Sequence, residues 1–336
     1  MSRDGEIAEF LAAEGWGGAA RRPLAGDASA RRYERLRRGA AAAILMDVPP
    51  ASGLSVGPFL AVDAWLRDAG FSAPAVLAAD DRLGLVLLED LGDALFARLC
   101  AEDPGREAGL YGAAIDLLAA LQELPPPAGA FVPPPYDLAF LLREARLALE
   151  WYLPAASGGP APEALAAEYE ALAAAAFAPF AVPAAPVYRD YHAENLIWLP
   201  ERSGHRRVGL LDFQDMLHGH PAYDLVSLIE DARRDVSPEL RAAMIARYRL
   251  RTGAEEEALD HAAHALSAQR NLKIVGLFAR LARRDGKPRY LELLPRVWGH
   301  LADDLGHPAL APLAAFVARW LPAPEPAVLA RVGAAA

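Results

Sequence analysis

Residues 188–198 read YRDYHAENLIW and residues 207–215 read RVGLLDFQD, and these two stretches decide the fold. Their apolar runs, NLIWL and RVGLL, are separated by PERSGH, a polar segment with Pro and Gly that is typical of a turn. The pattern predicts a β-hairpin within a region of otherwise helical periodicity. Asn195 before the first strand and Asp212 after the second would then lie at adjacent ends of two paired strands.

The residues that flank this hairpin carry the groups that phosphoryl transfer from ATP requires. One carboxylate must accept a proton from the attacking hydroxyl, and oxygen ligands must hold Mg²⁺ against the phosphates. Asp190 and Asn195 form a D-x-x-x-x-N segment, and Asp212 follows the second strand. We therefore predict that Asp190 is the catalytic base and that Asn195 and Asp212 bind Mg²⁺. The alternative is that these side chains only cap turns, because D-x-x-x-x-N by itself is a common spacing.

The first ninety residues are predicted to form a small sheet with one packed helix. Alternating apolar residues bounded by Gly, Pro and Asp indicate two pairs of strands. Apolar residues at spacings of three and four predict a helix over 56–69. The strands are expected at residues 30–38, 41–48, 75–80 and 83–90.

Beyond the segment LEDLGD at 88–93, where turn residues indicate a hinge, the pattern becomes helical. Two Pro-rich stretches, at 125–135 and 154–162, are predicted to be loops. The expected fold class is α+β, with a β-rich, nucleotide-binding N-lobe over 1–90 and a larger, mostly helical, catalytic C-lobe over 91–336. The helices are expected at residues 106–123, 137–152, 163–177, 222–234, 238–251 and 255–284.

Composition narrows the class of protein. The chain has 336 residues, of which 54% are hydrophobic, so a sizeable core is available. A net charge of −10 argues against nucleic acid as a partner. A single cysteine, Cys100, excludes an internal disulfide framework and fits a reducing cytoplasm. No long apolar run is present, so we expect a cytoplasmic protein without a membrane span and without an obligatory protein partner.

The motifs YRDYHAENL and LLDFQD resemble the catalytic and metal-binding motifs of the aminoglycoside phosphotransferase and choline kinase superfamily. The resemblance implies a protein-kinase-like two-lobed fold, with ATP and Mg²⁺ as cofactors. It also implies the same roles for Asp190, Asn195 and Asp212 as the spacing argument. In the downstream segment GHPAYDLVSL, Asp224 matches the aspartate that steadies the catalytic loop in that family.

A closer resemblance, from about residue 26 to residue 300, is to bacterial kinases that phosphorylate N-acetylmuramate and N-acetylglucosamine at the anomeric position. It rests on GDASARRY, ILMDVPP, YRDYHAENLIWLP, LLDFQDMLHGHPAYDLVSLIEDAR and QRNLKIVGLFARLARRDGKPRYLELLPRVW. The resemblance implies a sugar 1-phosphate product, made during recycling of peptidoglycan fragments. It also implies that the helix carrying Arg270 and Asn271 faces the sugar, while His192 is a candidate for substrate contact from the catalytic loop. A guanidinium there would suit the carboxylate of N-acetylmuramate.

One departure from the superfamily concerns the nucleotide. The strand lysine that usually contacts ATP phosphates is missing, since ILMD places Met46 or a neighbour there. Seven arginines lie within residues 21–38, and Arg31 or Arg32 is our candidate replacement. The turn GDAS, which ends at Ser29, offers backbone N–H groups to phosphate, and ATP is expected beneath the hinge at Glu89–Leu91, with Glu89 and Leu91 as contacts.

Two other interpretations stay open at this point. The acceptor could be an aminoglycoside, choline or homoserine on the same fold. Alternatively, the missing lysine could mark a pseudokinase that binds nucleotide without turnover, although a module without chemistry has no need of all three of Asp190, Asn195 and Asp212.

Overall fold

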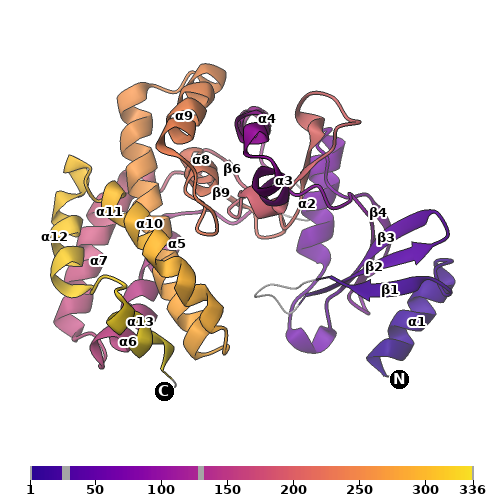
Figure 1. Ribbon diagram of the computed structural model, residues 1–336, viewed down its shortest axis with the longest axis horizontal. Coiled ribbons are helices and arrows are strands. Elements are labelled where there is room, and N and C mark those ends of the chain that lie inside the picture. Colours follow the sequence, from indigo (N-terminus) through magenta and orange to yellow (C-terminus); the bar gives the residue numbers. More distant parts are fainter. Residues whose placement is uncertain (1, 25–30, 128–131, 335–336) are drawn as a thin grey trace. The chain divides into compact units, whose positions relative to one another are not determined.

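The computed structural model describes residues 2–24, 31–127 and 132–334 (Figure 1). These residues pack into two compact units. The first unit draws on residues 1–106, 127–132 and 194–216, and the second on 107–126, 133–193 and 217–336. By packing, therefore, residues 91–106 and 194–216 belong with the N-terminal sheet. The predicted functional division at residue 90 into nucleotide-binding and catalytic lobes stays a prediction. None of the described helices is long and apolar enough to cross a membrane.

The first unit is built on a five-stranded antiparallel sheet with the order β1-β2-β3-β5-β4 (Figure 1). The four predicted strands and the helix over 56–69 are confirmed. The edge strand β1 was not predicted, because its sequence, ARRP, is short and all four residues are exposed. Helix α1 buries Ile7, Phe10 and Leu11 against one face of the sheet. The elements are α1 (Arg3–Ala13), β1 (Ala20–Pro23), β2 (Arg32–Arg38), β3 (Ala41–Asp47), α2 (Gly57–Asp68), β4 (Val76–Asp80), β5 (Leu85–Glu89) and α3 (Phe96–Glu102).

The predicted hairpin is also present in this unit. Strands β7 (Leu196–Trp198) and β8 (Val208–Leu210) pair antiparallel, with Leu196 opposite Leu210. The backbone N–H of Trp198 donates to the carbonyl of Ala94 (2.8 Å), and that of Leu210 donates to the carbonyl of Ser72 (3.0 Å). The hairpin therefore packs with the sheet-bearing unit, although the chain on either side of it, from Pro133 to Ala193 and from Leu217 onward, belongs to the second unit.

The second unit is mostly helical, and the 28-residue helix α10 (Glu256–Arg283) packs against α5, α8 and α11. Gly276 lets α10 approach the chain at Leu147 closely, since a Cβ at this glycine would lie 2.1 Å from the Leu147 carbonyl carbon. The main elements are α4 (Glu107–Gln122), α5 (Leu138–Ala145), α7 (Glu163–Phe177), β6 (Ala185–Val187), β9 (Leu217–Gly219), α8 (Ala222–Ile229), α9 (Pro238–Thr252), α11 (Leu294–Asp304), α12 (Ala311–Trp320) and α13 (Pro326–Gly333).

Three predictions for this unit need correction. The helix predicted over 222–234 is α8, which ends at Ile229. The segment predicted as one helix over 137–152 is α5 followed by a π-helical turn at Ala148–Tyr152. The Pro-rich stretch 154–162 is not all loop, because helix α6 (Leu153–Ser157) occupies its first part and ends at Gly158, whose φ is +86°. Pro154 is tolerated there because it lies in the first turn, where its missing N–H would have had no helical partner.

Candidate functional site

The predicted catalytic loop lies in the second unit, where one buried carboxylate binds its backbone. Asp224, on α8, accepts hydrogen bonds from the backbone N–H groups of Tyr188 (2.6 Å) and Arg189 (2.8 Å). Arg189 has a φ of +78°, a left-handed conformation that is rare for a side chain of this size. The two bonds to Asp224 hold the backbone in this conformation immediately before Asp190, as the family resemblance implied for Asp224.

Cations surround Asp190 in this unit. Glu144, on α5, forms ion pairs with Arg189 (2.6 Å) and with Lys273 of α10 (3.0 Å), and it also accepts a hydrogen bond from Tyr136. Burial would raise the pKa of Asp190, but the charges of Lys273 and Arg189 outweigh it and hold that pKa below its ordinary value. Asp190 is therefore a carboxylate at neutral pH, in a position to accept a hydrogen bond from a hydroxyl.

Three further residues predicted to contact substrate lie in the same unit. His192 is buried, and burial followed by the charge of Arg233 lowers its pKa to about 4, so its ring is neutral. Arg270 is buried and donates to the carbonyl of Glu230 (3.1 Å). Asn271 is fully buried, and its amide nitrogen donates to Glu230 (3.1 Å) and Asp304 (3.0 Å). These two bonds tie Asn271 to neighbouring helices of the unit. A contact between Asn271 and a sugar stays a prediction.

The predicted metal ligands, Asn195 and Asp212, lie at the end of the β7–β8 hairpin in the first unit. The N–H of Leu211 donates to the carbonyl of Asn195 (3.0 Å), which brings the two residues together as the strand spacing predicted. Asp212 has a φ of +60°, and Gln214 donates to its carboxylate (2.7 Å). An amide oxygen and a carboxylate fit Mg²⁺, which binds through one or two carboxylates and completes its shell with water and phosphate oxygens.

A cavity of about 420 Å³ opens beside these two residues, lined wholly by the first unit. Of the predicted nucleotide-binding residues, Arg31, Glu89 and Leu91 line it, together with Asn195 and Asp212. Arg32 is exposed and is not part of the lining, because successive residues near a strand point to opposite faces. Ser29 lies outside the described residues.

The lining residues that the sequence analysis did not single out include Tyr33 and Arg35 of β2. Burial and the charge of Asp212 raise the pKa of Tyr33 to about 12. Arg35 pairs with Asp90 (3.0 Å) and Asp93 (2.8 Å) in the segment LEDLGD. They share a strand face with Arg31, so alternation along β2 could have found them.

The same alternation indicates which residue of β3 stands at the position where a lysine was expected. Ile44 of β3, opposite Arg35 in the sheet, lines the cavity, whereas Met46 is fully buried in the core. The carboxylate of Glu89 is already engaged by Arg202 (2.8 Å) and by the N–H of Ala75 (3.1 Å). Of the predicted pair, Arg31 lines the cavity and Arg32 does not, and a contact of Arg31 with phosphate stays a prediction.

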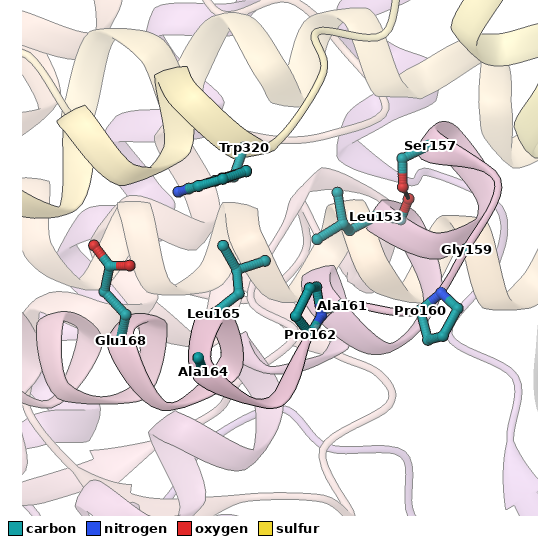
Figure 2. Close-up of a pocket in the computed structure, with 10 residues that line it drawn as sticks. All are labelled: Leu153, Ser157, Gly159, Pro160, Ala161, Pro162, Ala164, Leu165, Glu168 and Trp320. Carbon is teal, nitrogen blue, oxygen red and sulfur yellow. Dashed lines mark hydrogen bonds between the residues drawn. The ribbon is translucent and has the colours of Figure 1, made fainter.

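A second cavity, of about 430 Å³, lies in the other unit and contains none of the predicted site residues (Figure 2). It is lined mainly by apolar side chains and prolines from α6, α7 and the segment between them, with Trp320 of α12 across from Leu165. Glu168 is the single ionisable residue in its lining. Nothing in it resembles phosphotransfer chemistry.

Comparison with known proteins shows which proteins this chain is similar to. The model of the phosphotransferase enzyme family matches residues 20–261. A protein named N-acetylmuramate/N-acetylglucosamine kinase from Caulobacter vibrioides is 43% identical, in an alignment that covers 95% of this chain and 97% of that protein. The protein of the same name from Pseudomonas aeruginosa is 35% identical, with 94% of each chain covered.

Solved structures confirm the predicted α+β, kinase-like fold. A choline/ethanolamine kinase family protein from Mesorhizobium loti has a TM-score of 0.60 at 17% identity, covering 94% of this chain and 99% of that one. The streptomycin–ATP–APH(2″)-IIa ternary complex has a TM-score of 0.59 at 14% identity, covering 92% and 98%. At these identities the likeness concerns the fold alone.

Proposed function

The chain belongs to the phosphotransferase enzyme family, and on that basis we propose that it is an ATP-dependent kinase of N-acetylmuramate and N-acetylglucosamine. The observation that carries the proposal is the 43% identity to a kinase of that name over 95% of the chain. The product would be the sugar 1-phosphate, formed during recycling of peptidoglycan fragments.

In the proposed reaction the anomeric hydroxyl attacks the γ-phosphorus of ATP. The new bond joins the sugar oxygen to phosphorus, the bond between phosphorus and the β,γ-bridging oxygen breaks, and ADP leaves. Asp190 orients the hydroxyl and accepts its proton. Its lowered pKa suits this role in a loose transition state, where the proton is transferred late and a strong base is not needed.

The metal and the nucleotide are assigned to the first unit in the same proposal. Asn195 and Asp212 would hold Mg²⁺, which neutralises charge on the transferring phosphoryl group when bound. Arg31 would contact the phosphates in place of the usual lysine, since it lines the cavity and carries a charge that acts on Tyr33 beside Asp212. The adenine would lie against the segment that contains Glu89 and Leu91.

Turnover of the two sugars tests the proposal. Purified protein, ATP and Mg²⁺ should convert each sugar to a product whose ³¹P spectrum shows an anomeric phosphate. Asp190→Asn should lower kcat by about 10³-fold, within the range for loss of a general base. Choline, homoserine and an aminoglycoside serve as competing acceptors.

Two results would count against the proposal. If one of the competing acceptors is phosphorylated faster than both sugars, that acceptor, and not the sugars, is the substrate. ATP binding without turnover of any acceptor would favour a pseudokinase, the interpretation that the missing lysine supports.

A further inference from the structure

The middle of α10 is a buried polar segment, which is unusual for a helix inside a folded unit. Gln269, Arg270, Asn271 and Lys273 are all buried. Buried polar groups normally have partners, and each of these four side chains makes at least one hydrogen bond or ion pair. Gln269 donates to the carbonyl of Leu141 (2.9 Å), Lys273 pairs with Glu144, and Asn271 bridges two carboxyl groups. Arg270 differs from them.

Arg270 is 5% exposed, and its single hydrogen bond among the described residues runs from Nη1 to the carbonyl oxygen of Glu230. It forms no ion pair with any carboxylate in the described part of the chain, whereas Arg189 and Arg234 in the same unit pair with Glu144 and Glu107. A guanidinium has five N–H donors, and a buried charge without a counter-ion is costly. The remaining donors of Arg270 are therefore suited to an anion that a ligand supplies.

Apart from the carboxylate of Asp190, on which the charge of Arg270 acts, three titratable groups of the same unit carry little charge at neutral pH. Burial and the neighbouring Asp304 raise the pKa of Glu230 to about 7, so this carboxyl does not carry a full negative charge at neutral pH. Burial and the charges of nearby arginines together lower the pKa of His192 and of His300 to about 4, which keeps both rings neutral. The Nη1 of Arg233 lies 3.4 Å from Nε2 of His192 and adds a second cation to this surface.

Arg270 is also close enough to Asp190 for its charge to help lower the pKa of that carboxyl. An anion bound by Arg270 would thus lie near the hydroxyl that Asp190 receives. The two sugars of the proposed function differ in one charged group, because only N-acetylmuramate carries a lactyl carboxylate. We propose that Arg270 binds this carboxylate and so sets the preference for N-acetylmuramate over N-acetylglucosamine, an inference that rests on the proposed function.

The ratio of kcat/KM for the two sugars tests the assignment. Arg270→Met should lower kcat/KM for N-acetylmuramate by about 10- to 100-fold, the loss expected for hydrogen bonds to a charged group. For N-acetylglucosamine the loss should be smaller by about 10-fold or more, because no carboxylate contact is lost, so the ratio of the two kcat/KM values should fall. Arg270→Lys keeps the charge without the bidentate fork and should give an intermediate ratio. Arg280→Met, on the same helix, should leave the ratio unchanged.

Equal losses for both sugars would overturn the assignment, because Arg270 would then serve the phosphoryl group or Asp190. An unchanged ratio would overturn it as well. If Arg270→Met does not fold, as judged by its thermal unfolding, the lactyl amide of N-acetylmuramate replaces that variant. The amide should lower kcat/KM by the same factor in the wild type and by less in Arg270→Lys, and no effect in the wild type overturns the proposal. Failure of the proposed function would look different, because the wild type would then phosphorylate neither sugar.

Discussion

The guanidinium of Arg189 and the buried carboxylate of Glu144 form a partly buried ion pair, with Nη2 lying 2.6 Å from Oε1. Arg189 immediately precedes the proposed base, Asp190. Its counter-ion lies far from it in the sequence. The carboxylate comes instead from α5, where Lys273 shares it. The carboxylate of Glu144 thus holds the loop that carries Asp190, and no phosphorylated side chain is needed for this contact.

Glu144→Gln should destabilise the protein, because it removes the carboxylate that pairs with the buried Lys273 and the partly buried Arg189. Removing one partner of a buried pair costs about 3–5 kcal/mol, and we expect about 3 kcal/mol here in urea denaturation. The kcat should fall as well, since the loop that carries Asp190 loses a contact. Glu170→Gln removes an exposed ion pair with Arg146 and is the matched control, with an expected cost of about 0–1 kcal/mol. Equal costs for the two variants would show that the buried pair is not special.

Arg31→Met should raise the KM for ATP by about 10-fold or more, because a charged hydrogen bond to phosphate contributes about 1.5–3 kcal/mol. Arg32→Met is the control, since Arg32 is exposed and does not line the cavity. Its KM for ATP should stay within about twofold of the wild type, as for surface substitutions in general. Isothermal titration with a non-hydrolysable ATP analogue measures the same difference without turnover. A larger effect at Arg32 than at Arg31 would reverse the assignment.

Asp63, on α2, should make stability depend on pH. Its side chain is buried, its Oδ1 has no hydrogen-bond partner among the residues that the structure describes, and burial raises its pKa from 3.8 to about 7. A group whose pKa is raised on folding stabilises the fold fully below its unfolded value and loses that contribution as pH rises through its folded value. The free energy of unfolding should therefore fall between about pH 4 and pH 7.

Asp63→Asn keeps the shape of this side chain and cannot ionise. Its free energy of unfolding should decrease less than that of the wild type between pH 5 and pH 8, by about 1–3 kcal/mol, since one pKa unit corresponds to about 1.4 kcal/mol. Urea titrations at the two pH values measure the difference. Parallel pH profiles for the two proteins would mean that Asp63 does not titrate in this range.

Gly276→Ala should cost several kcal/mol, because the new Cβ would lie 2.1 Å from the Leu147 carbonyl carbon and helix α10 would have to move. Gly299→Ala, in α11, is the control, since a Cβ there meets nothing within 4 Å. That change should be neutral or stabilising by about 0.5–1 kcal/mol, as expected for Gly to Ala in a helix. Thermal unfolding of both variants decides the matter, and similar shifts would contradict the close packing at Gly276.

Much of the fold could be predicted because its signals are local. The hairpin β7–β8, the helix α7 and the strands of the sheet follow from periodicity and turn residues within short windows. The helix α6 was missed because Pro and Gly dominate its window, although Pro154 falls where a helix tolerates it. The strand β1 carries no alternation, since all four of its residues are exposed.

For the candidate site, the sequence indicated the residues of the loop and hairpin that carry the chemistry. It did not indicate which side chains from other elements pack around them. Asp190, Asn195 and Asp212 could be singled out by spacing, and Asp224 by resemblance. Glu144, Lys273 and Arg35 matter through partners far along the chain, and a single sequence does not indicate which distant carboxylate meets which cation. The same holds for Asp63, whose raised pKa depends on burial beneath other elements.

The buried polar segment of α10 also has a consequence for how the protein is made. Synthesis proceeds from the N-terminus, so the loop around Asp190 leaves the ribosome well before Lys273 and Arg270 do. Until α10 has been translated and packed, Glu144 has only Arg189 to pair with, and the carboxylate of Asp190 lacks two of the positive charges that keep it ionised. A nascent chain interrupted before this helix would carry every residue of the YRDYHAEN motif and still lack the electrostatic environment that the motif requires.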